Sequence, residues 1–242
     1  MKNNPIALSV IIPAFNEASR IKETIHNCNK YLNESGVLFE IIVVDDGSTD
    51  STSDIVTSLK KKQANIQLIK LEKNQGKGRA VQVGMMKADG VNRLFMDADG
   101  STSISEIEKL LPYLKHFEVI IGSRALVESR IKNNQVWYRR FFGKIGNKLI
   151  RLLFGLNISD TQCGFKLFTN NAADFIFPSL TLNRFGFDIE VLAIAKYHGL
   201  KIKEVPVVWS HSDGSKVKAM DYLDVLLSVF KVKVKMIFGL YK

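Results

Sequence analysis

Cysteine is scarce in this sequence, and so are long runs of apolar residues. The 242-residue chain has two cysteines, Cys28 and Cys163, which stand far apart and outside any CxxC pair. A disulfide-stapled fold is therefore excluded, a structural zinc site is not expected, and two unpaired thiols suit a reducing cytoplasm. No uninterrupted apolar stretch reaches the roughly 20 residues that a transmembrane helix needs. We expect neither such a helix nor, from the first residues MKNNPIA, a secretory signal peptide.

Acidic residues are the minority charge. Lysine and arginine number 34 against 24 aspartates and glutamates, which gives a net charge of +10. A basic surface predicts an anionic partner, such as a nucleic acid, a phosphorylated ligand or an acidic lipid surface. Hydrophobic residues make up 46% and charged residues 24%, which is ordinary for a globular protein and excludes intrinsic disorder, collagen and coiled coil. The length fits one large domain.

Short apolar runs alternate with helical patterns along the first half of the chain. The runs are rich in β-branched residues and end in turn residues, which is typical of buried parallel strands. The expected strands are 8–12, 40–44, 66–71, 92–96 and 118–121, and the expected helices are 17–34, 50–62, 77–88 and 103–115. The triplets 51–53 and 101–103 supply candidate N-caps. This alternation predicts an α/β fold with a doubly wound, mostly parallel central sheet.

Polar clusters follow four of the expected strands. Their sequences are PAFNE, DDGSTD, DADG and GSR. In doubly wound sheets, ligands bind at the carboxyl ends of the strands. Any one of these clusters could simply cap the next helix, but capping explains the whole set poorly. We therefore expect a binding site at this edge of the sheet.

Asp97 and Asp99 stand two residues apart, directly after an expected strand. In an extended segment such positions point the same way, and two adjacent carboxylates repel each other unless a cation compensates them. A few hard oxygen ligands suit Mg²⁺ or Mn²⁺, with phosphate oxygens completing the shell. A helix-capping turn is the alternative interpretation of this pair.

Two further loops favour a phosphorylated ligand. Residues 74–79, with the sequence NQGKGR, place two glycines and a lysine at the start of an expected helix, a setting that favours a bound anion. The P-loop spacing is absent, which argues against an ATPase. Asp45, at the end of its strand, could accept hydrogen bonds from a base or a ribose, although Asp46-Gly47 is also an ordinary turn signal.

The second half of the chain contains a basic amphipathic segment. No acidic residue occurs between Glu128 and Asp160, and apolar residues from 138 to 153 follow helical spacing among arginines and lysines. The segment is either a core helix with a solvated basic face or a helix lying on an anionic membrane. Residues 223–241 repeat the pattern as a second amphipathic helix, although 230–236 (FKVKVKM) also alternates as a strand would.

The motifs LSVIIPAFNE, IIVVDDGSTD, NQGKGRA and FMDADGST, in this order, resemble those of family 2 inverting glycosyltransferases with the GT-A fold. The resemblance covers essentially the whole chain. IGSR, DTQCGFKLF, FGFDIE and the W-x-H-x-D-G-S-K motif at 209–216 resemble the dolichyl-phosphate β-glucosyltransferase branch, to which dolichyl-phosphate mannosyltransferases are close relatives. In one departure, Ser101 stands where the mannosyl branch has a further polar metal ligand.

The resemblance implies roles for particular residues. Those expected around the donor nucleotide are Pro13, Ala14, Asn16, Glu17, Asp45, Asp46, Lys77, Asp97, Ala98, Ser215 and Lys216. Asp97 and Asp99 would form the metal-binding DxD motif. The lipid phosphate would be held by Arg124, Lys166 and one or both of Arg139 and Arg140. The catalytic set would be Asp99, Arg124 and Asp188, with Asp188 either a base for a hydroxyl acceptor or a residue that orients cationic side chains.

The function implied is transfer of a hexose, glucose from UDP-glucose first, to a polyprenyl or dolichyl phosphate. The enzyme would act peripherally on the anionic cytoplasmic face of a membrane, as a homo-oligomer or with a separate membrane-anchoring partner. One GT-A domain would comprise a nucleotide-sugar half (1–124), an acceptor half (125–218) and a C-terminal amphipathic helix (219–242). Alternatives are a GDP-mannose donor or a saccharide hydroxyl acceptor. Nucleic-acid binding is not expected, because acidic strand ends would repel a phosphate backbone.

Overall fold

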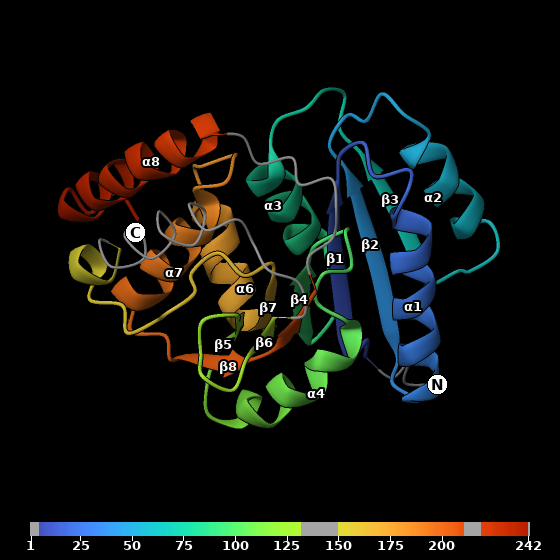
Figure 1. Cartoon of the computed structure of the whole chain (residues 1–242), viewed down its shortest axis with the longest axis horizontal. Coiled ribbons are helices and arrows are strands. Elements are labelled where there is room, and N and C mark those ends of the chain that lie inside the picture. Colours follow the sequence, from blue (N-terminus) through green and yellow to red (C-terminus); the bar gives the residue numbers. More distant parts are fainter. Residues whose placement is uncertain (1–4, 132–149, 211–218, 242) are drawn as a thin grey trace.

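The computed structural model describes residues 5–131, 150–210 and 219–241 (Figure 1). Within these residues, seven strands form one sheet in the order β3-β2-β1-β4-β7-β5-β8. The strands are β1 (Leu8–Ala14), β2 (Phe39–Asp45), β3 (Ile66–Lys70), β4 (Asn92–Met96), β5 (Val119–Ser123), β7 (Phe165–Thr169) and β8 (Ile202–Pro206). Only β7 runs antiparallel to its neighbours β4 and β5. The expected mostly parallel sheet is confirmed, and both halves of the chain contribute strands to it.

Helices cover both faces of this sheet (Figure 1). They are α1 (Ile21–Glu34), α2 (Thr52–Lys60), α3 (Lys77–Lys87), α4 (Ile107–Leu110), α6 (Asn170–Ile176), α7 (Phe187–Tyr197) and α8 (Ala219–Ile237), with 3₁₀ turns η1 (Ile104–Glu106), η2 (Leu111–Lys115) and η3 (Phe177–Ser179). Successive side chains of a strand point to opposite faces. Ile11 of β1 therefore joins a core with α3, α6 and α7, while Val10 and Ile12 join a second core with α1 and α2.

The first helix begins four residues later than the sequence predicts. Asn16 adopts a left-handed backbone conformation with φ of 53°. The Glu17 carbonyl then accepts hydrogen bonds from the amides of Arg20 and Ile21, both at 2.9 Å. A turn therefore occupies 17–20, and this turn shapes the loop after β1.

Two other expected helix features are also modified. The helix expected over 103–115 is divided into η1, α4 and η2, because Pro112 lacks an amide proton and crowds the preceding turn. At α2, Ser51 holds the N-cap position without a side-chain bond, and Asp50 Oδ1 instead accepts from the Thr52 amide at 2.9 Å. Ser103 does cap η1, where its side chain accepts from the Ser105 amide.

The C-terminal segment is a helix. Residues 230–236, which could also have formed a strand, lie inside α8. Most of the basic segment expected as a helix lies outside the described residues, although 150–154 is helical. Two short strands, β6 (Arg130–Ile131) and β9 (Val208–Trp209), pair in parallel beside the main sheet. Among the residues described, no helix has both the length and the apolar character needed to cross a bilayer.

Candidate functional site

The loops after β1 and β2 interlock at the carboxyl edge of the sheet. The backbone amide of Asn16 donates to Ser48 Oγ, and Asn16 Oδ1 accepts from the Thr49 amide, both at 2.8 Å. The Glu17 amide donates to Thr52 Oγ1, also at 2.8 Å. The first two predicted polar clusters therefore form one hydrogen-bonded unit, built from segments more than 30 residues apart.

Asp45 and Asp46 are both buried at the end of β2. Asp45 accepts from the Ser48 amide and from the Ser53 hydroxyl. Asp46 accepts from the amides of Gln75 and Gly76, each at 2.8 Å. Burial raises the pKa of Asp46, which these two amide bonds oppose. Asp46 thereby ties the end of β2 to the loop that leads into α3, and the predicted contacts of both carboxylates with a base or ribose remain predictions.

Lys77 begins α3 and points to the DxD motif. Its Nζ lies 2.7 Å from Asp97 Oδ1 and 5.2 Å from the centroid of the Phe95 ring. Burial works to lower the pKa of Lys77, but the negative charges of Asp97 and Asp188 outweigh it and raise the pKa. Lys77 is therefore a fixed cation at a helix N-terminus beside two carboxylates, which is a setting for an anionic ligand.

Asp97 follows β4 and is held against the segment before β7. Its backbone amide donates to the Gly164 carbonyl at 3.0 Å. A Cβ at position 164 would lie 2.0 Å from Asp97 Oδ2, so only glycine fits there. Asp97 Oδ1 is buried, and within the described part of the chain its polar contact is the ion pair with Lys77. The Asp97 carboxylate is thus fixed in place with unused capacity to bind a ligand.

Asp99 carries a charge that the protein compensates poorly. Its Oδ1 accepts from the Ser101 amide at 2.9 Å. Burial and the neighbouring charge of Asp97 raise the pKa of Asp99. A divalent cation would relieve this repulsion, and carboxylate oxygens suit Mg²⁺ or Mn²⁺. Asp97 and Asp99 therefore fit the predicted metal.

The described residues offer the metal an incomplete shell. No group of three histidine, cysteine or acidic side chains among them could hold an ion. Phosphate oxygens of a bound nucleotide would have to supply further ligands. Loop 211–218, which contains the predicted donor contacts Ser215 and Lys216, lies outside the described part of the chain.

Arg124 is rigidly held at the end of β5. Its Nε and Nη2 donate to the two carboxylate oxygens of Asp160 at 2.7 and 2.9 Å, and its guanidinium carbon lies 5.7 Å from the Trp209 ring centroid. Burial works to lower the pKa of Arg124, but the charge of Asp160 and the bonds to it raise it. About a quarter of the side chain (26%) remains exposed. Arg124 is therefore an oriented, permanent cation that can still contact a ligand.

Lys166 and Asp188 form a buried ion pair. Lys166 is 1% exposed, and its Nζ donates to Asp188 Oδ1 and to the Cys163 carbonyl. Asp188 lies in the first turn of α7, and burial raises its pKa, opposed by Lys166 and Lys77. This pair is the contact expected if Asp188 orients a cation, and that role remains a prediction. Because the Lys166 ammonium is enclosed, its predicted contact with the acceptor phosphate remains a prediction, and Arg139 and Arg140 lie outside the described residues.

Three residues predicted around the donor have buried side chains, and their contacts with it remain predictions. Pro13 and Ala14 are the last residues of β1, and their side chains are buried. Ala98 is also buried, and its carbonyl accepts from Thr24 Oγ1 at 2.8 Å. These small or rigid residues hold the strand ends in place.

Sequence reasoning assigned no role to Asp160, Gly164 or Trp209. Asp160 orients Arg124, Gly164 makes room for the Asp97 carboxylate, and Trp209 packs against the guanidinium. All three fall inside the motifs DTQCGF and W-x-H-x-D-G-S-K. Their place in these motifs was the available sign of a functional role. The contact partner of each residue is distant in the chain and could not be predicted from the motif.

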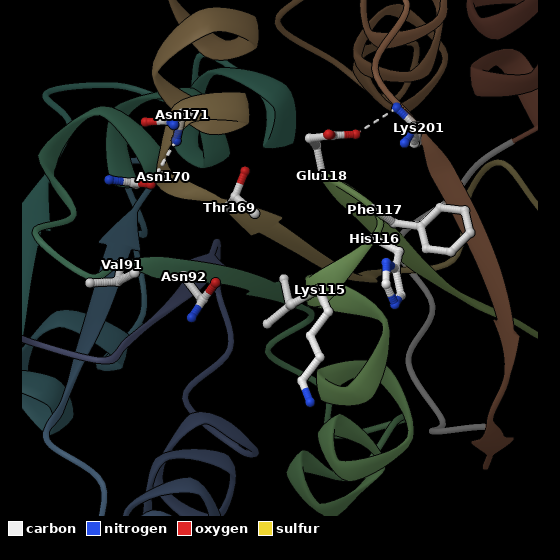
Figure 2. A pocket seen from close by; sticks show the side chains of 11 residues that line it. Val91, Asn92, Lys115, His116, Phe117, Glu118, Thr169, Asn170, Asn171 and Lys201 are labelled. Carbon is white, nitrogen blue, oxygen red and sulfur yellow. Dashed lines mark hydrogen bonds between the residues drawn. The ribbon is translucent and has the colours of Figure 1, made fainter.

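A pocket of about 380 Å³ lies at the opposite edge of the sheet (Figure 2). Its lining includes Asn92 at the start of β4, Glu118 just before β5 and Thr169 at the end of the antiparallel β7. In Figure 2 the Glu118 carboxylate accepts from the Lys201 amide, a bond of 2.7 Å. The DxD motif follows the other end of β4, so this pocket is separate from the candidate site.

Comparison with known proteins is consistent with this site. Residues 9–177 match the family model "Glycosyl transferase family 2". A dolichyl-phosphate beta-glucosyltransferase of Trichomonas vaginalis is 37% identical over 96% of this chain and 72% of its own length. One from Dictyostelium discoideum is 36% identical over 98% of this chain and 77% of its own. Glucosyl-3-phosphoglycerate synthase from Mycobacterium tuberculosis, crystallised with Mn²⁺, UDP-glucose and phosphoglyceric acid, has a TM-score of 0.69 at 17% identity, covering 94% of this chain and 79% of that one.

Proposed function

Because the chain belongs to glycosyl transferase family 2, we propose that it transfers glucose from UDP-glucose to a polyprenyl phosphate of the dolichyl type. Relatives at 34–37% identity carry the name dolichyl-phosphate beta-glucosyltransferase, which supports the sugar and the acceptor. The synthase of the same fold that was crystallised with Mn²⁺ and UDP-glucose supports the donor and the metal. The further proposal of a membrane-surface location follows from the acceptor, whose polyprenyl chain is embedded in lipid.

The observation that carries the proposal is the placement of cations around Asp97. Lys77 forms an ion pair with Asp97, and Arg124, at the end of β5, is held by Asp160 near enough to Asp97 for that carboxylate to add to the raised pKa of Arg124. A nucleotide diphosphate and a lipid phosphate repel each other as they approach. Lys77 beside the donor and Arg124 toward the acceptor offset that repulsion at one sheet edge.

The acceptor can react without a general base. The second pKa of a phosphate monoester is near 6, so the group is mostly dianionic at pH 7 and is itself a nucleophile. One of its oxygens forms a bond to the anomeric carbon while the bond from that carbon to the diphosphate breaks. This single displacement inverts the anomeric centre and gives a β-linked product from an α-linked donor. Mg²⁺ or Mn²⁺ held by Asp97 and Asp99 would stabilise the charge that develops on the departing diphosphate.

The contacts of Asp188 help to distinguish a phosphate acceptor from a saccharide hydroxyl acceptor. A hydroxyl nucleophile needs a positioned carboxylate to take its proton. Asp188 is 3% exposed and paired with Lys166, so its described contacts are those of an orienting group. This observation favours the phosphate acceptor. GDP-mannose stays an alternative donor, because the described residues do not distinguish the base or the sugar.

A panel of donors and acceptors tests the proposal. The purified protein with Mg²⁺ or Mn²⁺ would be given UDP-glucose, other UDP-sugars or GDP-mannose, each with polyprenyl phosphate, unphosphorylated polyprenol or a free saccharide. We expect transfer from UDP-glucose to the phosphorylated lipid alone. Transfer to the saccharide without transfer to polyprenyl phosphate would overturn the acceptor, and preference for GDP-mannose would overturn the donor.

Two matched variants make the assay specific. Asp99→Asn should lower kcat by roughly 100-fold or more, as expected when an electrostatic contact to the transition state is removed. Asp89→Asn removes one charge at an exposed position away from the site and should retain wild-type turnover. Near-normal activity in Asp99→Asn would overturn the metal assignment.

A further inference from the structure

We propose that the outward face of α8 is a docking surface for an anionic lipid bilayer. Figure 1 shows α8 at the periphery of the molecule, with α7 between it and the sheet. The inference deepens the proposed function by naming the surface through which the protein meets the membrane. Its test measures binding without substrates, so that it can fail or succeed independently of the transfer reaction.

The helix has two apolar faces. At about 100° per residue, Val225, Val229, Val232 and Met236 share one side, and these residues pack into the core. A second set faces away from the core, with exposures between 39% and 73%: Leu226, Leu227, Phe230, Val234, Ile237 and the following Phe238. A helix that needed only to cover the core would carry polar residues there. The described residues leave this second face exposed, and a contiguous exposed apolar patch marks an interaction surface.

Lysines border the outward apolar face. Lys233 lies on one side of it and Lys231 and Lys235 on the other. Lysine stems can extend along apolar surface while the ammonium groups reach a polar layer. Among the α8 side chains that the structure describes, Asp224 is the only acid. An apolar face with basic borders matches the interface between acyl chains and anionic headgroups.

Several contacts fix α8 to the rest of the protein. Val229 and Val232 are fully or almost fully buried. The Tyr241 hydroxyl donates to Glu190 Oε1 at 2.6 Å, and Lys233 Nζ donates to the Leu153 carbonyl at 2.7 Å. Leu152, which precedes Leu153 in the chain, is a further exposed apolar residue, at 81%. The outward face is thus carried on an anchored helix.

The anchored helix lies close to the candidate site. A Cβ at Gly186 would lie 2.4 Å from Ser228 Oγ, so α8 packs directly against the start of α7. Asp188, two residues later, pairs with Lys166. A bilayer bound along α8 would therefore lie on the side of the protein where α7 enters the site, which is where a lipid-borne phosphate must arrive.

A second copy of the chain fits this face less well. Pairing two α8 helices face to face would bring the lysine borders of both copies together, and like charges in contact are destabilising. An anionic lipid surface instead offers a complementary charge for Lys231, and for Lys233 and Lys235, whose ammonium groups each use one of three donors on the protein, at the Leu153 carbonyl and at Thr181 Oγ1. We therefore commit to the bilayer as the occupant.

Vesicle binding of charge-matched variants tests the proposal. The full chain would be mixed with vesicles of neutral lipid alone or with 30% or so anionic lipid, and the bound fraction measured by flotation. We expect wild type to bind anionic vesicles, and Phe230→Glu/Val234→Glu to bind at least tenfold more weakly. The control Leu38→Glu/Leu111→Glu adds the same charge at two exposed apolar positions on other elements and should bind at least threefold more tightly than the α8 variant.

Equal binding by the α8 variant and the control would overturn the proposal, as would a wild type that does not bind vesicles. A wild type that forms dimers through α8, with the dimer abolished by the α8 variant and unaffected by vesicles, would also overturn it. Circular dichroism and melting curves would check that each variant is folded. Because the substituted side chains are exposed, we expect all of the variants to fold.

A fluorescent label gives a second readout that does not depend on added charge. Both native cysteines are 1% exposed, and burial raises the pKa of Cys28 to about 12 and of Cys163 to about 12, so neither should compete for a thiol reagent. An environment-sensitive dye on Ile237→Cys should shift to shorter wavelength with anionic vesicles, and the same dye on Leu38→Cys should not. Identical spectra at the two positions would contradict docking through α8.

Discussion

Single carboxylates in this protein differ in how well their charge is compensated. Asp160 is matched by Arg124, which lowers its pKa although burial works to raise it. Asp46, Asp99 and Asp188 have a raised pKa, with burial as the largest cause in each. Asp46 accepts two backbone amide bonds and Asp188 pairs with Lys166, whereas Asp99 lies beside the like charge of Asp97, and a pKa perturbed in this way is common at ligand sites. The comparison therefore separates Asp160, which supports another residue, from Asp99, which is available to a cation.

Asp160→Asn tests this difference through the pH dependence of stability. A carboxylate with a lowered folded-state pKa adds stability above its unfolded value of about 3.8 and loses it as the pH falls further. At pH 7 we expect Asp160→Asn to lower the free energy of unfolding by roughly 3 kcal/mol, because it leaves a largely buried guanidinium without its counter-charge. As the pH falls below about 4, the difference from wild type should shrink. Denaturant unfolding at each pH measures it.

Asp174→Asn is the matched control. Asp174 also pairs with an arginine, Arg93, but its side chain is 61% exposed. The Asp174 carboxylate is mostly exposed to solvent, and the buried Arg93 guanidinium keeps a hydrogen bond to the Met85 carbonyl at 2.8 Å, so Asp174→Asn should cost less stability at pH 7 than Asp160→Asn. If the two variants lose the same stability at pH 7, the Arg124–Asp160 pair contributes no more to the free energy of unfolding than the Arg93–Asp174 pair does.

Among the elements, β7 shows what the sequence leaves undetermined. Its run FKLFT carries Lys166 as the second of five residues, and a lysine in a short apolar run argues against a buried central strand. The lysine is tolerated because Asp188 neutralises it, and that partner lies 22 residues further along the chain. The strand could not be predicted without knowing this pair. In contrast, β4 was predicted to the residue and β1 and β2 to within two residues, because each contains an uninterrupted apolar run: 10–12, 41–44 and 94–96.

The anchor at the end of α8 gives a prediction for a pair of elements. Glu190 is fully buried and accepts from the Tyr241 hydroxyl and from the amides of Thr181 and Leu182. Tyr241→Phe removes one donor to a buried carboxylate and should cost about 1.5–3 kcal/mol. Faster hydrogen exchange at the amides of Thr181 and Leu182 should accompany the lower melting temperature.

Tyr197→Phe is the control for this substitution, because Tyr197 is 48% exposed at the end of α7. It should change neither the melting temperature nor the exchange of the 181–182 amides. The loop at 181–183 also contacts the start of α3, on the donor side of the candidate site. Carbonyls of Leu182 and Asn183 pack so closely on Gly78 and Gly76 that a Cβ at either position would lie within 2.6 Å of them. If Tyr241→Phe leaves exchange in the loop unchanged, α8 is not coupled to it.

For the molecule as a whole, periodicity and strand ends were sufficient to predict the sheet and the edge where the site lies. The order of residues along one strand determines its two faces, and the polar residues after it mark its carboxyl end. The way in which the second half closes the sheet was not predictable, because β7 and β8 join through pairings far apart in sequence. The same limit applies to Arg124, whose position was expected but whose partners Asp160 and Trp209 were not.

The incomplete metal shell leads to a prediction for the whole protein. Asp97 and Asp99 belong to no group of three suitable ligands within the described residues, so metal and nucleotide should each bind weakly alone and tightly together. A ligand at about 100 times its Kd stabilises a fold by about 2.7 kcal/mol, or roughly 5–10 °C for a chain of this size. We expect UDP with Mn²⁺ to raise the melting temperature by that amount, and by more than the sum of the two separate shifts. In Asp99→Asn, the melting-temperature shift with UDP and Mn²⁺ together should no longer exceed the sum of the two separate shifts, and the shift with UDP alone should remain. The Asp89→Asn control should behave as wild type. Additive shifts in wild type, or an unchanged excess in Asp99→Asn, would show that the nucleotide diphosphate does not complete a metal site at this carboxylate pair.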